Sequence, residues 1–461
     1  MSQTQSISNT EQSMDNFTRE SVSSNSNIRL CDSTADNSLS LFCYNKCTTE
    51  DTDLVKNCRG VIFNNDTLVF KGFPYTPEFP SEEMSKFTEL FADDFQNYEF
   101  YDSYEGALLR VFNWSDKWYV TTNRKIDAFH SKWSSKDSFG QMFRNAVEFQ
   151  YRQEGSDIRN NIGECEESEV YDKFFDTLNK TYQYMFIVCN TFDNRIVCSA
   201  SETPVVYHVG TFKDCGEQFS MNETCGFPYP VRHRFESFDD VEKYVNESGF
   251  ERIQGVVAYG PRNFQVKLLN NDYYNLFNAR GNEPSIKFRY LQVRMDEKQT
   301  NMLYFLYPRF ADTFDEYENS LYEIAQQINS NYIRRFIKKK YVTVPKDEYV
   351  VMKACHSWHL EDRDRNRISL RKVIDLLNEQ SPTSLNHMIR HHKLNSKKEA
   401  KRPRAKSDLD TINPDDFESA ENAVNPPSPV HEQPQAEQAE QAEQADNTST
   451  EGNAPSSEQG N

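Results

Sequence analysis

Residues 106–122, GALLRVFNWSDKWYVTT, alternate apolar and polar side chains on both sides of a short polar turn. Such alternation predicts two half-buried β-strands, and Ser115 and Asp116 at its centre predict the turn of a hairpin. Three further segments repeat the pattern, at residues 60–70, 184–201 and 255–269. Four hairpins on one chain predict antiparallel sheets that pack face to face, with helices on the outside.

Three helical segments are expected between the predicted strands, and a longer helical region follows them. The three segments fall at residues 138–152, 170–180 and 238–248. From about residue 298, apolar residues recur at helical spacing, as in Phe314, Tyr317, Leu321, Ile324 and Ile328. The predicted fold class is therefore α+β, with an antiparallel β core and flanking helices over residues 38–290 and a mostly helical domain over residues 291–400.

The two ends of the chain differ in composition from its middle. Only 37% of the 461 residues are hydrophobic, below the roughly 45–50% of an average globular chain. Residues 1–37 are rich in Ser, Asn, Thr and Gln, and residues 401–461 contain the repeat AEQAEQAEQ. Such segments bury too little apolar surface to offset the entropy of ordering. Both ends are therefore predicted to be disordered tails.

Charge is distributed unevenly along the chain, whose formal net charge is -19. Residues 411–461 hold eleven acidic residues and no Lys or Arg, whereas residues 390–406 hold eight Lys or Arg and one acid. The basic run is typical of a nuclear-targeting segment, a nucleic-acid contact or a solvated helix end. A second cluster, NYIRRFIKKK at residues 331–340, is typical of a helix with a solvated basic face or of a phosphate-contacting surface.

Several classes of protein are excluded by what the sequence lacks. No stretch of 18 apolar residues is present, which argues against a transmembrane helix, and the N-terminus lacks the layout of a secretory signal. The ten cysteines are scattered without zinc-type spacing, so we expect reduced thiols and no metal site. We therefore expect an intracellular protein of the cytoplasm or nucleus, with no membrane partner.

An ordered set of motifs in residues 39–281 resembles the adenylyltransferase domain of RNA ligases, most closely those of the phage type. The matching segments, in chain order, are NCRGVIF, YDSYEGALLRVF, KWYVTTNRKID, FIVCNTFDNRIV, IQGVVAY and VKLLNNDYYNL. The resemblance implies a nucleotidyltransferase-like fold followed by a helical domain. In that superfamily a lysine attacks the α-phosphate of ATP, carboxylates hold metal ions and further lysines neutralise phosphates.

Four positions of this sequence depart from the residues that the family's chemistry uses. The family motif K-x-D-G reads SYEG here, so that Ser103 stands in the place of the nucleophilic lysine. Counting along the later motifs puts Val188 and Gln254 in the places of two carboxylates, and Leu269 in the place of a lysine. The resemblance therefore implies a degenerate site without a catalytic residue.

The residues that remain are candidates for binding rather than for catalysis. The motif matches retain three candidates for contact with a nucleotide, namely Arg59, Glu105 and Lys267. The basic clusters supply candidates for contact with nucleic-acid phosphates: Arg334, Arg335, Lys338, Lys339, Lys340, Arg402 and Arg404.

Segments such as SYEGALLRVFNWSDKWYVTTNRKIDAFHSKW and SFGQMF also resemble an immediate-early protein family of iridoviruses and related large DNA viruses. Together the resemblances imply a viral early protein of the host cytoplasm or nucleus. Its degenerate ligase-like domain is expected to bind RNA, DNA or nucleotide without adenylylation and without a cofactor. Two alternatives stay open. One is an active RNA ligase with a relocated nucleophile, which would need ATP and Mg²⁺, and the other is a protein-interaction scaffold that recruits host or viral proteins through the acidic tail.

Removal of residues 411–461 tests whether the acidic tail competes for the basic run. We expect the shortened chain to bind RNA or DNA more tightly, because eleven negative charges no longer compete for residues 390–406. The gain should shrink as salt is added, since screening shortens the reach of the charges. Fluorescence anisotropy with a labelled oligonucleotide measures the affinity. Unchanged or weaker binding at low salt would rule out this competition.

Overall fold

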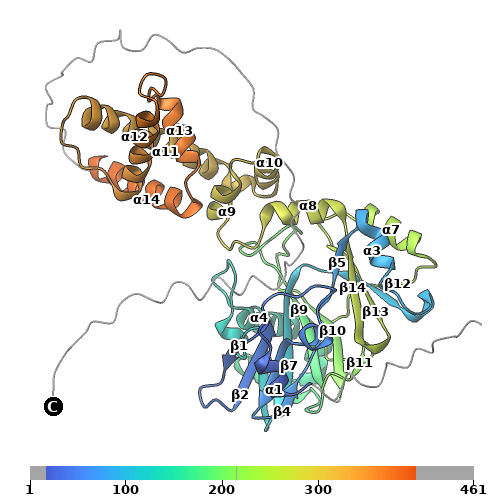
Figure 1. The fold of residues 1–461 in the computed structure, drawn as a ribbon. Helices are drawn as coiled ribbons and strands as arrows, with labels where there is room; N and C mark the ends of the chain where they lie inside the picture. The colour runs from blue at the N-terminus through green and yellow to red at the C-terminus, as the bar shows by residue number, and fades with distance from the viewer. Residues whose placement is uncertain (1–16, 214, 401–461) are drawn as a thin grey trace, which may run out of the picture. The chain divides into compact units, whose positions relative to one another are not determined.

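A computed structural model describes residues 17–213 and 215–400 of the chain (Figure 1). These residues divide into two compact units, of which unit 1 ends at Ser285 and unit 2 begins at Ile286. The division falls shortly before residue 290, where the sequence predicted a boundary. The predicted tail over residues 401–461 lies outside the described residues.

Unit 1 contains three β-sheets, in which neighbouring strands are antiparallel except for the pair β5 and β14. The first sheet has the order β1-β2-β3-β4, with β1 (Ile28–Ser33), β2 (Leu39–Tyr44), β3 (Arg59–Asn64) and β4 (Thr67–Phe70). The second has the order β11-β10-β9-β7-β8, with β7 (Gly106–Trp114), β8 (Lys117–Thr121), β9 (Gln183–Cys189), β10 (Val206–Lys213) and β11 (Gln218–Ser220). The third has the order β12-β6-β13-β14-β5, with β5 (Glu78–Pro80), β6 (Glu99–Ser103), β12 (Arg232–His233), β13 (Gly255–Gly260) and β14 (Phe264–Leu269).

Three of the four predicted hairpins are confirmed: β3–β4, β7–β8 and β13–β14. The turn between β7 and β8 lies at Ser115 and Asp116, as predicted. Both residues have positive φ, 51° and 59°. A turn with two such residues has the twist that matches the twist of its two strands.

The fourth predicted hairpin, over residues 184–201, is wrong in its second half. β9 pairs with β7 on one side and with β10 on the other, and residues 190–205 form no strand. The backbone N–H groups of Ile196, Val197 and Cys198 donate instead to the carboxylate of Glu105. Because these three N–H groups donate to Glu105, they cannot hydrogen-bond to a neighbouring strand. The predicted second strand of this hairpin therefore does not form.

The three predicted helical segments are confirmed as α4 (Phe139–Arg152), α6 (Val170–Asp176) and α7 (Phe238–Glu247). α4 and α6 pack on one face of the second sheet, and α7 packs on the third sheet beside α3 (Met84–Thr88) (Figure 1). An inner apolar cluster draws side chains from all three sheets. The other helices described in unit 1 are α1 (Arg19–Ser24), α2 (Asp53–Asn57), α5 (Asp157–Ile162) and α8 (Asn271–Arg280).

The expectation of a disordered tail over residues 1–37 is wrong for its second half. α1 and β1 lie there, and β1 pairs with β2 along the edge of the first sheet. Val22 and Ile28 are buried against aromatic side chains such as Phe42 and Phe63. A few aliphatic side chains are enough here, because the sheet edge supplies backbone hydrogen-bond partners that the composition does not reveal.

Unit 2 is helical in its described residues, as the spacing of apolar residues predicted. Its longest helix, α11 (Ala311–Tyr332), buries Phe314, Leu321, Ile324 and Ile328. α11 contacts four of the other helices, namely α9, α12, α13 and α14, which makes it the central helix of the unit. The other helices are α9 (Ile286–Val293), α10 (Glu297–Leu306), α12 (Lys346–Glu361), α13 (Leu370–Asn378) and α14 (Pro382–Ala400).

Two further features of the described chain concern membranes and thiols. No described helix combines the length and the hydrophobicity that crossing a bilayer needs.

All ten cysteines are free thiols. Burial raises the pKa of Cys189 and Cys225 to about 12, which keeps these two thiols protonated and unreactive.

Glu348 in α12 is the one acidic residue of unit 2 for which the described structure combines burial with an oxygen that lacks a hydrogen-bond partner. Its residue is 2% exposed, and its Oε2 accepts no hydrogen bond from any described residue. Burial, with the charge of Asp347 beside it, raises the pKa of Glu348 from 4.5 to about 7. A carboxyl group with a raised pKa in the folded state destabilises the fold once it must ionise.

We expect the free energy of unfolding of the wild-type chain to fall as pH rises from about 4.5 to 7. Over that range the unfolded chain has lost the Glu348 proton while the folded chain still holds it. The free energy of unfolding therefore falls by about 1.4 kcal/mol for each pH unit. Glu348→Gln should remove this loss and gain about 2–3 kcal/mol at pH 8 relative to wild type. Urea unfolding at pH 5 and pH 8 measures the difference, with exposed Glu361→Gln as control. A gap between wild type and Glu348→Gln that is equal at both pH values would contradict the assignment.

Candidate functional site

Unit 1 contains a cavity of about 150 Å³ between its second and third sheets. Its lining residues come from β7, β9 and β10 on one side and from β6, β13 and β14 on the other, with Arg59 at the start of β3. Aromatic and aliphatic side chains, such as Phe73, Trp133 and Val257, form much of the wall. A small set of polar residues completes it, which is the usual composition of a ligand pocket.

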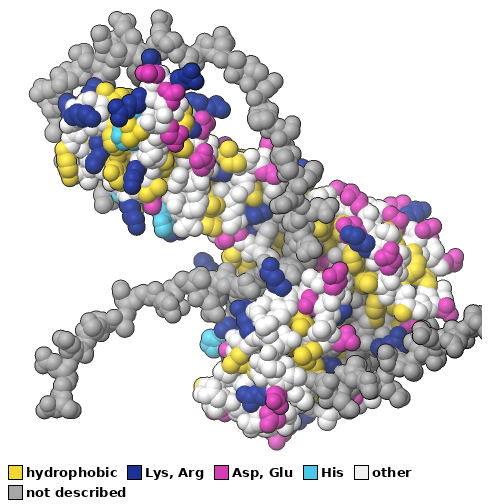
Figure 2. Space-filling model, in the orientation of Figure 1, with side chains coloured by type: hydrophobic (Ala, Val, Ile, Leu, Met, Phe, Trp, Pro, Cys, Tyr) yellow, Lys and Arg dark blue, Asp and Glu magenta, His cyan; other side chains and the backbone are white. Residues whose placement is uncertain are grey.

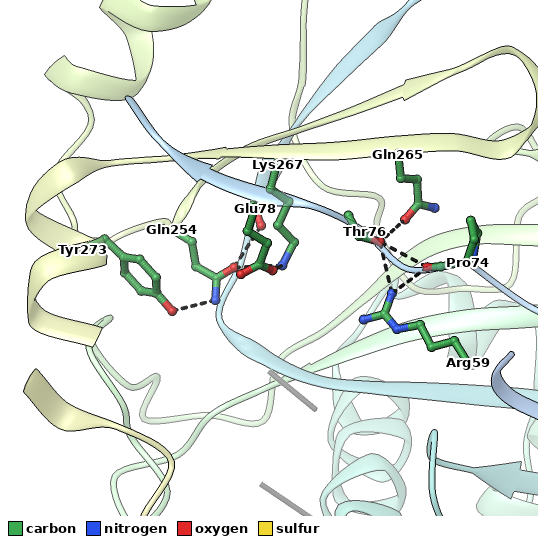
Figure 3. A network of polar contacts seen from close by, with 9 residues as sticks. Arg59, Pro74, Thr76, Glu78, Gln254, Gln265, Lys267 and Tyr273 are labelled. Carbon is green, nitrogen blue, oxygen red and sulfur yellow. Dashed lines mark hydrogen bonds and ion pairs between the residues drawn. The ribbon is translucent and has the colours of Figure 1, made fainter. Parts of the chain in front are cut away.

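One chain of polar contacts joins three of the positions that the motif comparison singled out. Ser103 Oγ donates to Gln254 Oε1 at 3.0 Å, and Lys267 Nζ donates to the same oxygen at 3.4 Å. Lys267 also forms an ion pair with Glu78 at 2.7 Å, and Gln254 Nε2 donates to the Tyr273 hydroxyl at 2.8 Å (Figure 3). The serine and the glutamine that replace charged family residues therefore hydrogen-bond each other inside the cavity.

Arg59 lies on the same wall, where its guanidinium contacts neutral oxygens. Arg59 Nη1 donates to the carbonyl of Pro74 at 3.2 Å and to the hydroxyl of Thr76 at 3.1 Å (Figure 3). Thr76 Oγ1 donates in turn to Gln265 Oε1 at 3.0 Å. Gln265 and Lys267 lie two positions apart in β14 and both line the cavity, so Arg59 and Lys267 belong to one continuous polar wall.

The glycine that follows Arg59 is required by its surroundings. Gly60 has a φ of +74°, and a Cβ there would lie 2.1 Å from Nη1 of the buried Arg110. Gly255, next to Gln254, has a φ of +151°, and its Cβ would lie 2.0 Å from the carbonyl oxygen of Leu268. These two motif glycines are therefore explained by backbone packing and carry no information about catalysis.

Both carboxylate oxygens of Glu105 accept hydrogen bonds from other segments of the cavity wall. Its Oε1 accepts from Asn190 Nδ2 and the Ile196 N–H, each at 3.0 Å. Its Oε2 accepts from the N–H groups of Val197 at 2.8 Å and Cys198 at 3.2 Å. Burial raises the pKa of Glu105, while these four donors act in the opposite direction. The carboxylate ties the segment after β9 to the start of β7.

Asp102 is a cavity residue that the motif comparison missed. Its side chain is fully buried and accepts hydrogen bonds from His233 Nε2 at 2.9 Å and the Tyr244 hydroxyl at 2.8 Å. Arg252 at 3.4 Å and the Tyr104 hydroxyl at 3.3 Å approach its other oxygen. The sequence offered one indication of this role, namely that Asp102 directly precedes Ser103. Its partners His233 and Tyr244 lie more than 100 positions further along the chain.

Val188, which the motif count puts in the place of a carboxylate, does not line the cavity. It packs into the apolar cluster beneath α4 and α6, whereas its neighbour Ile187 lines the cavity. Alternation along β9 places adjacent residues on opposite faces of the sheet, so a shift of one residue exchanges core for cavity. The conclusion that no carboxylate stands there is unchanged, because Ile187 is also apolar.

Glu78, Gln265 and Asn123 are further polar residues of this site that sequence comparison did not single out. Asn123 lines the cavity, and its Oδ1 is buried and accepts no hydrogen bond from the described residues. A buried acceptor without a donor is costly, so this oxygen is suited to a donor on a ligand.

The candidates for nucleic-acid contact lie elsewhere. Those from Arg334 to Lys340 are in unit 2, directly after α11, whereas the cavity residues are in unit 1. Arg402 and Arg404 lie outside the described residues. The structure therefore brings the three nucleotide candidates to one cavity and leaves the basic cluster as a separate feature.

The variant Glu105→Gln tests whether the hydrogen bonds of the Glu105 carboxylate stabilise the fold. The amide would turn an N–H₂ group toward backbone N–H groups, leaving two buried donors without an acceptor, so we expect Glu105→Gln to lose about 2–3 kcal/mol of unfolding free energy. Urea unfolding measures the loss, with exposed Glu82→Gln as a matched control. If Glu105→Gln unfolds like wild type but loses ligand binding, Glu105 contacts the ligand directly.

No family model matches the chain. Two curated relatives are named "Immediate-early protein ICP-46 homolog". The protein of Invertebrate iridescent virus 6 is 26% identical over 373 residues, which cover 76% of this chain and 80% of the relative. The protein of Invertebrate iridescent virus 3 is 27% identical over 377 residues, 78% of this chain and 79% of the relative. The "Immediate-early protein ICP-46" of Frog virus 3 is 27% identical over 258 residues, 54% of this chain and 62% of the relative.

The comparison with solved structures also found matches to ATP-dependent ligases. An Aquifex aeolicus protein named as an ATP-dependent DNA ligase has a TM-score of 0.36 and 15% identity, covering 72% of this chain and 84% of that one. An archaeal ATP-dependent RNA ligase has a TM-score of 0.33 and 12% identity, covering 57% of this chain and 69% of that one. By sequence, the chain has homologues among the immediate-early ICP-46 proteins of iridoviruses.

Proposed function

We propose that this chain is a viral early protein whose cavity binds a purine nucleotide without forming a covalent adduct. The observation that carries the proposal is the contact between Ser103 and Gln254 inside the cavity, with Lys267 held by Glu78 beside them. Polar groups suited to a nucleotide are present, but Ser103 stands at the position that the family's nucleophilic lysine takes.

The size and walls of the cavity support a base-sized ligand. A cavity of about 150 Å³ is the size that accepts one aromatic ring in other proteins. Aromatic and aliphatic side chains offer stacking to such a ring, and the Asn123 Oδ1 offers an acceptor to an exocyclic amine. The phosphates of such a nucleotide would face the part of the cavity wall that carries Arg59 and Lys267.

Lys267 is already engaged by side chains of the protein. Its Nζ forms an ion pair with Glu78 at 2.7 Å and donates to Gln254 Oε1 at 3.4 Å. Lys267 is also the only lysine among the described residues that line the cavity. Its ammonium can neutralise phosphate charge, which is a binding role.

Both acids of the cavity wall are already engaged by protein donors. The oxygens of Glu105 accept four hydrogen bonds, and those of Asp102 accept from His233, Tyr244, Arg252 and Tyr104. A divalent cation prefers charged oxygens that are free to ligate it. We therefore propose that nucleotide binding does not depend on a protein-held metal ion, and that no cofactor is required.

Incubation with labelled ATP and with labelled GTP, each with Mg²⁺ or Mn²⁺, tests the proposal in two steps. We expect saturable binding in equilibrium dialysis and no labelled band on a denaturing gel, for wild type and for Ser103→Lys. Ser103→Lys still lacks acids that are free to hold metal. Arg59→Ala and Lys267→Ala should each weaken binding about 5–50-fold, as expected for a lost charge-assisted contact. Exposed Arg234→Ala serves as the matched control.

A labelled band on the gel would overturn the proposal and support an active ligase with a relocated nucleophile. Mapping the modified lysine would then identify that nucleophile. Absence of any nucleotide binding by the folded wild-type chain would also overturn it. Equal affinities of Arg59→Ala, Lys267→Ala and Arg234→Ala would place the nucleotide outside this cavity.

A further inference from the structure

We propose that unit 2 carries a binding surface for single-stranded nucleic acid on residues 334–341, the segment that follows α11. We name this segment the basic turn. The proposal does not depend on nucleotide binding in the cavity, because every residue that carries it lies in the other unit.

The basic turn is a concentrated positive charge without an acid in its own sequence. Residues 331–346, NYIRRFIKKKYVTVPK, contain six Lys or Arg and no Asp or Glu. Arg334 and all three lysines, Lys338 to Lys340, are exposed. Figure 2 shows Lys and Arg side chains gathered over this helical unit, with hydrophobic side chains between them. Exposed cations without paired acids are suited to phosphate groups.

The backbone of the basic turn is held in a defined shape. α11 ends at Tyr332 and continues as a single π-helical turn, Ile333–Ile337. The N–H of Lys338 donates to the carbonyl of Ile333 at 2.9 Å, and Lys339 has a φ of 53°. The left-handed residue turns the chain sharply, so consecutive lysines are presented by a closed turn rather than by an extended strand. Such preorganisation reduces the entropy lost on binding.

Side chains beneath the turn anchor it to α12. Phe336 stacks on His356 with ring centroids 4.0 Å apart, and the guanidinium of Arg335 lies 5.2 Å from the centre of the Tyr349 ring. Arg335 Nη1 also donates to the carbonyl of Val342 at 3.4 Å. Arg335, which the sequence suggested as a phosphate contact, is therefore a positioning residue.

Two apolar side chains of the basic turn remain in solvent. Tyr341 is 89% exposed and Ile337 is 65% exposed, whereas Tyr332 at the end of α11 is 3% exposed. A helix that was merely solvated on one face would bury its apolar residues on the other. An exposed aromatic ring among exposed cations is instead the combination on which bases of a single strand stack while their phosphates contact the cations.

The exposed tyrosine favours a single strand over a duplex. In a duplex the bases already stack on one another, so an aromatic side chain can stack only on a base that is unpaired or at an end. Phosphates alone would be satisfied equally by either form. The two properties together identify an unpaired polynucleotide as the partner.

Fluorescence anisotropy of the full-length chain with labelled single-stranded oligouridine tests the proposal, with salt varied from about 50 to 200 mM. The variant Lys338→Ala/Lys339→Ala/Lys340→Ala should lose about 10–100-fold in affinity at the lowest salt. Its salt dependence should flatten by about two in the slope of log affinity against log salt, since each phosphate contact contributes about 0.7. The matched control, Lys287→Ala/Lys298→Ala/Arg371→Ala, removes three exposed charges from other helices of unit 2.

A second pair of variants tests stacking separately from charge. Tyr341→Ala should lose about 5–100-fold in affinity, because a ring that stacks on a base is removed. Tyr341→Phe keeps the ring and should bind like wild type. All of these residues are exposed, so circular dichroism and thermal unfolding should show unchanged folding for each variant.

Four outcomes would overturn the proposal. The first is equal binding by the triple lysine variant and its matched control. The second is wild-type affinity of Tyr341→Ala. The third is equal competition by duplex and by single-stranded RNA. The fourth is that the lysine variant loses binding to phosphatidylserine-containing vesicles but keeps its RNA affinity, which would make the basic turn a membrane contact.

Discussion

The buried guanidinium of Arg110 in β7 is the contact on which the arrangement of unit 1 depends. Arg110 is 1% exposed and donates to the backbone carbonyls of Arg59, at 3.1 Å, Gly60 and Thr122. It thereby joins the first sheet to the second and fixes the strand that carries Arg59. A buried charge must be matched by hydrogen bonds, and the carbonyls of Arg59 and Gly60 supply two of them. A side chain at position 60 would collide with the guanidinium, which explains the glycine there.

The glycines and acids around the cavity have structural roles. Gly60 and Gly255 lie where other parts of the chain approach the backbone closely. Glu105 and Asp102 accept hydrogen bonds from segments that are distant in the sequence. At the two positions that the motif resemblance assigns to the nucleophile and to a carboxylate, Ser103 and Gln254 hydrogen-bond each other. Motif spacing alone therefore does not establish an activity for a fold.

Unit 2 shows the complementary situation, in which polar groups are left unmatched at the surface. Its central helix buries one regular apolar stripe, and the regularity ends at the π-helical turn. Beyond that point the chain exposes cations and an aromatic ring together. Inside the same unit, Glu348 is buried with an oxygen that accepts no hydrogen bond from the described residues, so the unit also contains a carboxyl group whose ionisation opposes folding.

Three hairpins, the three helical segments of unit 1 and the helical character of unit 2 could be predicted from the sequence, because strand alternation, turn residues and helical spacing are local properties of the chain. Motif spacing also suggested Arg59, Glu105 and Lys267 as candidates for one site, and all three line one cavity. The strand predicted after residue 190 is wrong, because backbone N–H groups there donate to Glu105, a residue distant in the sequence. The pairing of charges could be seen only in the folded chain: Lys267 and Glu78 are 189 positions apart, and Asp102 and His233 are 131 apart. Such pairs arise from the order in which strands join the third sheet, and that order leaves no pattern in the local sequence.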